Sequence, residues 1–141
     1  MNNEKKAPVR QIKFRGLRVD GKGWAIGWLQ PHTNANKIVI LQLYNEHDWL
    51  RHEVLPETVG QFTGVYDIDK KEIFEHDVVT FGRREGKYNV VYKGDGFIAI
   101  SHEGDEYGPY THRLNPINST NIVFIPKILG NIHEEREVIN G

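Results

Sequence analysis

The chain has 141 residues and a mass of 16.3 kDa, with 18 basic and 19 acidic side chains and no cysteine. This length predicts one domain with at most a small appended part, and the missing cysteines exclude disulfides and thiolate-held sites. The net charge of −1 and the pI near 6.7 are not typical of a domain that binds nucleic acid over its whole surface. Composition thus indicates a globular protein and leaves its function open.

No part of the sequence looks like a targeting or membrane segment. The first six residues are polar or charged apart from Met1, and the longest candidate apolar run covers residues 38–41. A membrane helix needs about 20 apolar residues, and a signal peptide needs an apolar stretch behind a basic start. We therefore expect a soluble protein in the cytoplasm, with no membrane partner.

Short apolar alternations separated by glycine and proline predict strands in the N-terminal third. Residues 11–19 alternate at period two, and Asp20-Gly21 then favours a hairpin because both residues tolerate a positive φ. The return strand is predicted over residues 23–30, which are rich in aromatic side chains. This region therefore begins with a β hairpin.

The middle of the chain is less regular. Residues 37–44 predict a third strand, whose apolar centre indicates burial on both faces. Residues 45–53 fit either a loop or a turn of helix, and residues 56–62 predict a short helix that begins at Pro56. The boundary between two parts of the chain is expected here.

The second half shows a clearer β pattern. Turn signals recur about every 8–12 residues, which is typical of a β barrel or sandwich. Residues 102–118 are polar and predict a long loop. The predicted strands cover residues 63–67, 72–75, 77–82, 87–93, 97–101, 121–125 and 128–133.

Several segments resemble the YopX family of phage and prophage proteins. The central match is a Thr-Gly-apolar-x-Asp stretch, a turn, and then Lys-Glu-Ile-aromatic-Glu followed by one intervening residue, an Asp and two apolar positions. Three further pieces agree in order and spacing, so that the resemblance spans roughly residues 12–134. The matching segments are residues 54–67 with 71–79, 12–16, 90–97 and 128–134.

Two positions depart from the family pattern. The family usually has glycine before the Lys-Glu-Ile and glycine again between the Glu and the Asp, and this chain has Lys70 and His76 instead. A residue other than glycine in the left-handed region costs about 1 kcal/mol or more. We therefore expect a longer or type I-based turn in place of a type I′ turn at Lys70.

The resemblance implies a mainly β fold with at most one or two short helices. It implies a C-terminal SH3-like β barrel, within residues 54–141, preceded by a small β-rich part over residues 1–53. It also implies expression in the cytoplasm of a bacterial host during phage carriage. It carries no catalytic residues that can be assigned here, and we expect no enzyme activity and no cofactor.

Basic residues are concentrated at the N-terminus. The first 22 residues carry a net charge of +5, so the remainder carries −6. On a strand, Lys13 and Arg15 share one face, and we expect Ile12 and Phe14 to point inward on the other. Cations beside aromatic rings bind phosphates and stack on bases, which predicts a nucleic-acid site; the alternative is a solvated sheet edge protected by its charge. The candidate residues are Lys13, Arg15, Arg18, Lys22 and Trp24.

An acidic cluster offers a second candidate site. Glu75 and Asp77 would lie on the same face of a strand, where paired carboxylates can bind Mg²⁺ or carry out acid–base chemistry with His76. This arrangement would suit a metal-assisted hydrolase. The alternative is structural, with Asp67 and Asp69 forming a turn and Asp77 fixing the loop that enters the barrel.

The aromatic content favours an interaction protein. The chain has 3 Trp, 6 Tyr and 6 Phe, which is more than one small barrel core needs. We expect some of these rings, with Trp49, Tyr107 and Tyr110 as candidates, to form a binding surface or an interface between copies. The leading hypothesis is therefore a non-enzymatic module that self-associates and binds an unknown protein partner.

Overall fold

A computed structural model describes residues 11–30, 36–81, 84–114 and 125–134. The first of its two sheets has the strand order β4-β3-β2-β1-β5-β6. A short 3-10 helix, η1 (Pro56–Thr58), lies between β4 and β5. The strands of this sheet are β1 (Phe14–Leu17), β2 (Trp24–Gln30), β3 (Ile38–Leu43), β4 (Trp49–Val54), β5 (Gly60–Tyr66) and β6 (Glu72–Phe74).

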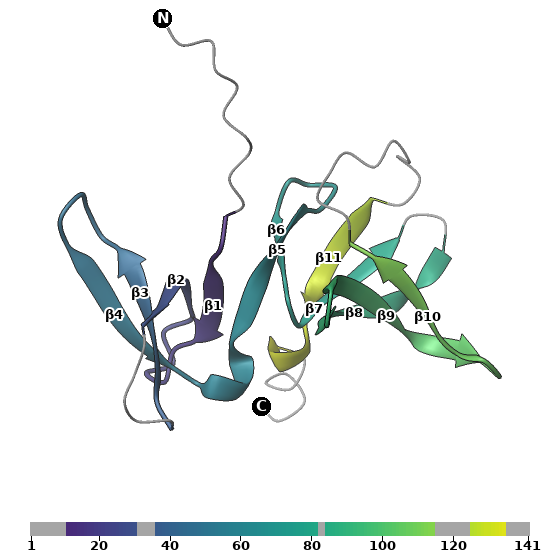
Figure 1. Cartoon of the computed structure of the whole chain (residues 1–141), viewed down its shortest axis with the longest axis horizontal. Coiled ribbons are helices and arrows are strands. Elements are labelled where there is room, and N and C mark those ends of the chain that lie inside the picture. Colours follow the sequence, from purple (N-terminus) through teal and green to yellow (C-terminus); the bar gives the residue numbers. More distant parts are fainter. Residues whose placement is uncertain (1–10, 31–35, 82–83, 115–124, 135–141) are drawn as a thin grey trace, which may run out of the picture.

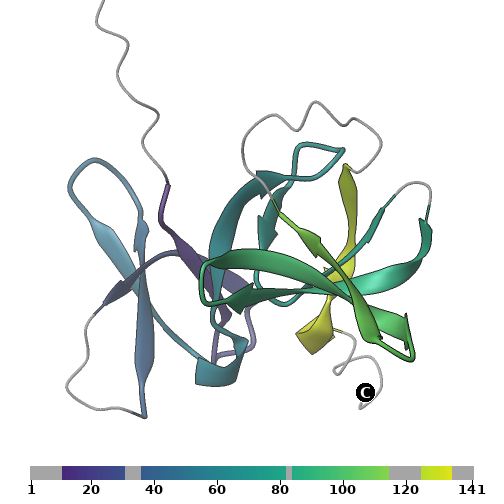
Figure 2. The same ribbon diagram turned by 45° about the vertical axis from the view of Figure 1, so that its right-hand side comes forward.

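The second sheet has the strand order β10-β9-β8-β7-β11, and all of its pairs are antiparallel. Figures 1 and 2 show β5 and β6 between this sheet and the group formed by β1 to β4. The strands are β7 (Asp77–Phe81), β8 (Arg84–Lys93), β9 (Gly96–Asp105), β10 (Gly108–Arg113) and β11 (Pro126–Asn131).

The mainly β class is confirmed, and the specific SH3-like barrel is not. Across the described ranges neither sheet closes into a barrel. The one helix that lies wholly within these ranges is η1. No helix in this described part is long and apolar enough to cross a bilayer.

Two hydrophobic clusters lie on either side of the expected boundary near residue 54. The smaller cluster centres on Ala25, Ile40 and Val54, against which Phe14 packs. The larger cluster is formed by strands of the second half, and its buried members are Ile73, Val79, Phe81, Tyr88, Val90 and Ala99. Strand β5 nevertheless pairs with β1, so hydrogen bonds cross this boundary.

The two strands that the sequence missed are β4 and β10. Residues 49–54 of β4 pair with β3, although residues 45–53 fitted a loop or a turn of helix. Strand β10 pairs with a β9 that continues to Asp105, where a long loop was expected. Both strands are largely exposed, so neither shows the apolar alternation that marks a strand with one buried face. The strand predicted over residues 121–125 falls almost wholly outside the described residues.

The turn between β5 and β6 is long, as expected. Tyr66 pairs with Glu72, which leaves residues 67–71 in the turn. One oxygen of the buried Asp67 carboxylate accepts the N–H groups of Asp69 and Lys71, at 2.9 and 2.8 Å. The other oxygen accepts the Ile128 N–H at 3.1 Å and so ties the turn to β11.

Lys70 in this turn has a φ of 62°. Replacing Lys70 by glycine should raise the free energy of unfolding by about 0.5–1 kcal/mol, since the relief of left-handed strain exceeds the extra chain entropy of glycine. Urea unfolding followed by circular dichroism measures this change. The matched control is Lys71→Gly, which should destabilise, because Lys71 is not among the residues with positive φ. A Lys70→Gly variant as unstable as the control would contradict the prediction.

Candidate functional site

Arg15 and Asp77 join the two sheets through a buried ion pair. Arg15 lies on β1 and Asp77 begins β7, and the Arg15 Nη2 donates to the Asp77 Oδ1 at 2.5 Å. The other oxygen of Asp77 accepts the Phe74 N–H at 2.8 Å. Asp77 is only 1% exposed, and both of its carboxylate oxygens accept hydrogen bonds from groups of the protein.

The guanidinium of Arg15 also lies between two aromatic rings. Its Cζ is 4.7 Å from the centroid of the Trp24 ring and 4.8 Å from that of Phe74. Cations over aromatic rings are stabilised by the ring quadrupole, particularly where water is excluded. The structure thus brings Trp24 and Arg15 together, as the nucleic-acid hypothesis required, but the Arg15 guanidinium bonds Asp77 at the start of the second sheet.

Burial controls the titration of Asp77. It raises the pKa of the carboxyl above its ordinary value of 3.8, while the Arg15 charge and the Phe74 N–H act in the opposite direction. Moving a carboxylate out of water disfavours its charged form, and a neighbouring cation restores part of that loss. The charged form of Asp77 therefore depends on Arg15.

Lys13 follows the same pattern as Arg15. It forms an ion pair with Glu72, and its Nζ lies 4.9 Å from the centroid of the Phe62 ring. Lys13 and Arg15 share a face, as predicted, but this face contacts β5, β6 and the start of β7. The expectation that Ile12 points inward is wrong, because Ile12 is exposed while both cations are largely buried.

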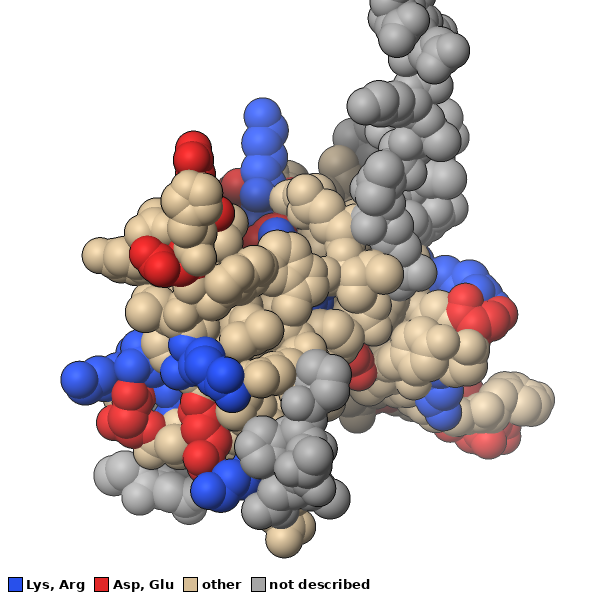
Figure 3. All heavy atoms as spheres, turned by 60° about the vertical axis from the view of Figure 1, so that its left-hand side comes forward, with Lys and Arg blue, Asp and Glu red and all other residues tan. Residues whose placement is uncertain are grey.

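The remaining basic candidates lie at the β1–β2 turn. Arg18 pairs with Asp20 at 2.5 Å, and the same carboxylate accepts the backbone N–H of Lys22 at 3.0 Å. Figure 3 shows charges of both signs interleaved on this side of the molecule, beside a broad uncharged area. Three of the four basic candidates, Lys13, Arg15 and Arg18, are therefore engaged with acids of the same chain.

The acidic candidates do not share a strand face. The sequence placed Glu75 and Asp77 on one strand, but β6 ends at Phe74 and β7 begins at Asp77. His76 between them has a φ of 76°, which turns the chain. Glu75 accepts the Gln61 N–H at 3.0 Å, whereas Asp77 pairs with Arg15. Among the described residues, no three acidic or histidine side chains are grouped as a metal would need.

An exposed apolar surface in the first sheet lies across β2, β3 and β4. We call Ile26, Trp28, Leu43 and Trp49 the tryptophan face. Trp28 and Trp49 are 48% and 47% exposed, and their ring centroids lie 5.1 Å apart in an edge-to-face arrangement. Leu43 pairs directly with Trp49, and residues two apart on a strand share a face. The four side chains therefore form one continuous surface.

The other two aromatic candidates lie elsewhere. Tyr107 is 90% exposed at the turn between β9 and β10, and Tyr110 follows on β10. This hairpin belongs to the second sheet and extends from the side of the molecule opposite to β4 (Figure 1). Trp49 is thus joined by Trp28, Leu43 and Ile26, and not by the two tyrosines.

A signal for the tryptophan face was present in the sequence. Trp24, Ile26 and Trp28 recur at period two along β2, while Ala25 between them is fully buried. Large side chains on one face of a strand and small ones on the other indicate that the small side packs closely on the core. The sequence alone did not show that Arg15 lies over Trp24 whereas Ile26 and Trp28 stay exposed.

The fold and its surfaces define a mainly β protein whose described residues form two antiparallel sheets, joined by a buried ion pair and carrying an exposed aromatic face. Comparison with protein families matches the YopX protein family over residues 13–140. The chain therefore belongs to the YopX family, and the resemblance found in the sequence is confirmed. A comparison with curated proteins finds no match.

Proposed function

We propose that this YopX-family protein is a non-enzymatic interaction module, which self-associates and binds a protein partner in the cytoplasm of a phage-carrying bacterial host. The tryptophan face supports this proposal. Solvent-exposed tryptophans packed against each other and rimmed by polar residues are typical of protein-binding surfaces. Monomeric proteins otherwise tend to cover such side chains.

A protein partner fits these observations better than nucleic acid does. The ion pairs of Lys13, Arg15 and Arg18 leave little free positive charge beside Trp24. Phosphate binding depends on cations that are available to displace counterions from the nucleic acid. The tryptophan face, in contrast, needs no charge to bury apolar area.

The experiment that tests this function is affinity capture from lysate of a phage-carrying host, with and without nuclease. Trp28→Ala should reduce retention of a specific protein more than about tenfold, because central tryptophans dominate interface energies. Tyr107→Ala is the matched control, since it removes a more exposed ring from the other sheet. Circular dichroism melting shows that both variants fold.

Two results would overturn the proposed protein partner. Captured material that disappears on nuclease treatment would indicate nucleic-acid association instead. A protein retained equally by Trp28→Ala and by the wild type would show that the tryptophan face is not the docking surface.

A further inference from the structure

Strand β4 forms an edge of the first sheet, and one end of that edge is covered. The Glu53 carbonyl accepts the Val19 N–H at 3.0 Å, and the Leu55 N–H donates to the Leu17 carbonyl at 2.8 Å. These bonds come from the end of β1, which also forms an isolated bridge to β4. They show that the backbone groups of Glu53 and Leu55 point away from β3.

The remainder of this edge is open. Backbone groups on a strand alternate between its two sides, so those of Trp49 and Arg51 point outward like those of Glu53. In the part of the chain that the structure describes, no strand pairs with this side of Trp49 or Arg51. An open edge with exposed apolar side chains is a template for pairing with another chain.

We propose that two copies of the protein pair through β4, antiparallel, around a two-fold axis at Leu50. This inference rests on the self-association in the proposed function and specifies its geometry. Leu50 would meet Leu50 of the second copy, while the backbone groups of Trp49 and Arg51 would exchange hydrogen bonds in both directions. The first sheet of one copy and the first sheet of the other then form one continuous sheet.

Backbone direction and charge exclude the registers on the C-terminal side of Leu50. Residues whose backbone groups point outward can pair only with one another. The two-fold axis must therefore pass through a residue, because an axis between two residues would pair outward-pointing with inward-pointing ones. An axis at Arg51 would place two like charges directly opposite, which is destabilising. An axis at His52 would require Glu53, whose carbonyl already bonds Val19. The axis at Leu50 uses only open groups.

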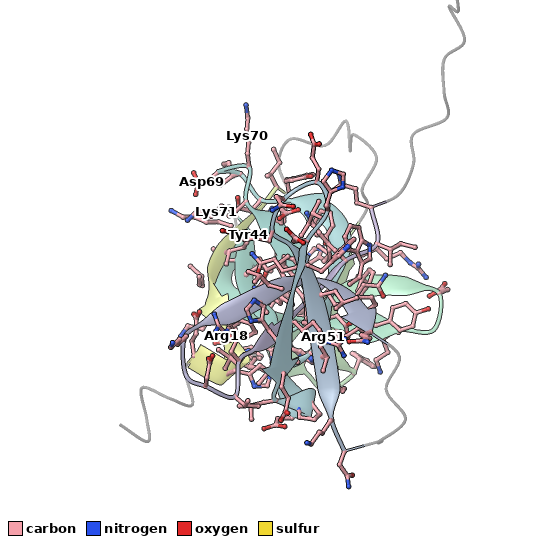
Figure 4. The ribbon with its side chains drawn as sticks, turned by 90° about the vertical axis from the view of Figure 1, so that its left-hand side faces the viewer. Arg18, Tyr44, Arg51, Asp69, Lys70 and Lys71 are labelled. Carbon is pink, nitrogen blue, oxygen red and sulfur yellow. The ribbon has the colours of Figure 1, made fainter. Side chains whose placement is uncertain are left out.

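Side chains are complementary in the chosen register. Arg51 lies opposite Trp49 of the second copy, where a guanidinium can stack on the indole, and this contact occurs twice. Asp48 lies opposite His52 of the second copy, so no like charges meet at this position. Figure 4 shows Arg51 on this side of the molecule, well away from the charged residues 69–71.

Pairing of this kind leaves the tryptophan face accessible. Trp49 and Arg51 lie on the same sheet face as Trp28, because Leu41 pairs with both Trp28 and Arg51. Joining two β4 strands edge to edge extends this face across the axis. The dimer would therefore present two adjacent tryptophan faces to a protein partner.

A cysteine at position 50 tests the register, because the natural chain has no cysteine. Directly opposed residues in the non-hydrogen-bonded position have Cα atoms about 4.5 Å apart, which permits a disulfide. Leu50→Cys should therefore form covalent dimers on oxidation with diamide. The matched control is Gln42→Cys. Gln42 lies on β3 opposite Leu50, and in the proposed dimer it would be about 14 Å from Gln42 of the second copy. Equal cross-linking of the two variants would overturn the register.

Charge substitution gives an independent test. Leu50→Lys and Leu50→Glu should each weaken self-association at least tenfold, because like charges would meet at the axis. Mixing the two variants should restore dimers, because the introduced lysine of one copy would then lie opposite the introduced glutamate of the other. Only a dimer in which position 50 meets itself predicts this result. Sedimentation measures both effects, and two variants that dimerise as well alone as when mixed would contradict the proposal.

Measurements on the wild type distinguish failure of self-association from failure of the β4 geometry. If sedimentation at tens of micromolar shows only a 16.3 kDa species, the proposed self-association fails, whereas capture of a protein through the tryptophan face remains a separate test. If the wild type dimerises but Leu50→Cys does not cross-link, only the β4 geometry fails.

Discussion

Replacing Arg15 by methionine is expected to lower the free energy of unfolding by about 3–5 kcal/mol at neutral pH, because it leaves the buried Asp77 carboxylate without its partner. Methionine keeps much of the apolar length that packs between Trp24 and Phe74. Urea unfolding followed by circular dichroism measures the loss. The large effect is expected because Asp77 is almost completely buried.

The pH dependence of this loss has a definite sign. Burial already raises the pKa of Asp77 above its ordinary value, and removal of Arg15 takes away the cation that opposes this rise. The folded variant then binds a proton at a higher pH than the unfolded chain does, so its stability falls as pH rises through the pKa of Asp77 in the folded state. The cost of Arg15→Met should therefore be smaller at acidic pH than at pH 7.

The matched control is Arg113→Met, which removes an ion pair of similar length at the surface. Arg113 donates to Asp95 at 2.8 Å, and both side chains are exposed. Exposed pairs contribute little because water and salt screen them. Arg113→Met should therefore change stability little at any pH, and an equally small effect of Arg15→Met would show that the inter-sheet pair does not hold the sheets together.

Replacing Gly27 by alanine is expected to destabilise the protein by about 3 kcal/mol or more, because the added methyl group has no space. A Cβ at Gly27 would lie 1.9 Å from the carbonyl oxygen of Leu41 and 2.8 Å from its carbonyl carbon. Both atoms belong to the backbone of β3, so no side-chain movement can relieve the contact. Thermal melting should show a large drop in midpoint.

Gly96→Ala is the control for this substitution. Gly96 also lies on a strand, but the nearest atom to its Cβ would be the Arg113 Nη1, at 3.9 Å. The methyl group fits there, and it reduces the entropy of the unfolded chain, so little change or slight stabilisation is expected. If Gly27→Ala and Gly96→Ala had the same melting temperature, the backbone of β3 would not lie this close to Gly27 of β2.

The predicted turns were more reliable than the predicted loops. Asp20-Gly21 was identified because its φ preferences act within a few residues, and the turn before β6 is long as expected, although Lys70 adopts a positive φ in it. Strands β4 and β10 were missed because most of their side chains are exposed. Their strand conformation comes from hydrogen bonds to the preceding strands β3 and β9, and such backbone bonds leave no apolar alternation in the sequence.

The candidate sites were only partly predictable for the same reason. Residue type identified Asp67 as a turn former, and period two placed Lys13 and Arg15 on one face. It gave no information on what lies opposite that face. The partners of these cations, Glu72 and Asp77, are about 60 residues away along the chain, and their pairing follows from the hydrogen bonds between β1 and β5.

The sequence by itself determined the β class, the main turns and membership of the YopX family, because these depend on short-range patterns and residue order. The tertiary structure alone decided which face of each strand is covered. It turned Arg15 toward Asp77 and left Trp28 and Trp49 exposed, although alternation alone treats Trp24 and Trp28 alike. The physical reason is that alternation fixes which side chains share a face, whereas burial depends on which strands lie over that face, and here the cations of β1 contact β5, β6 and the start of β7.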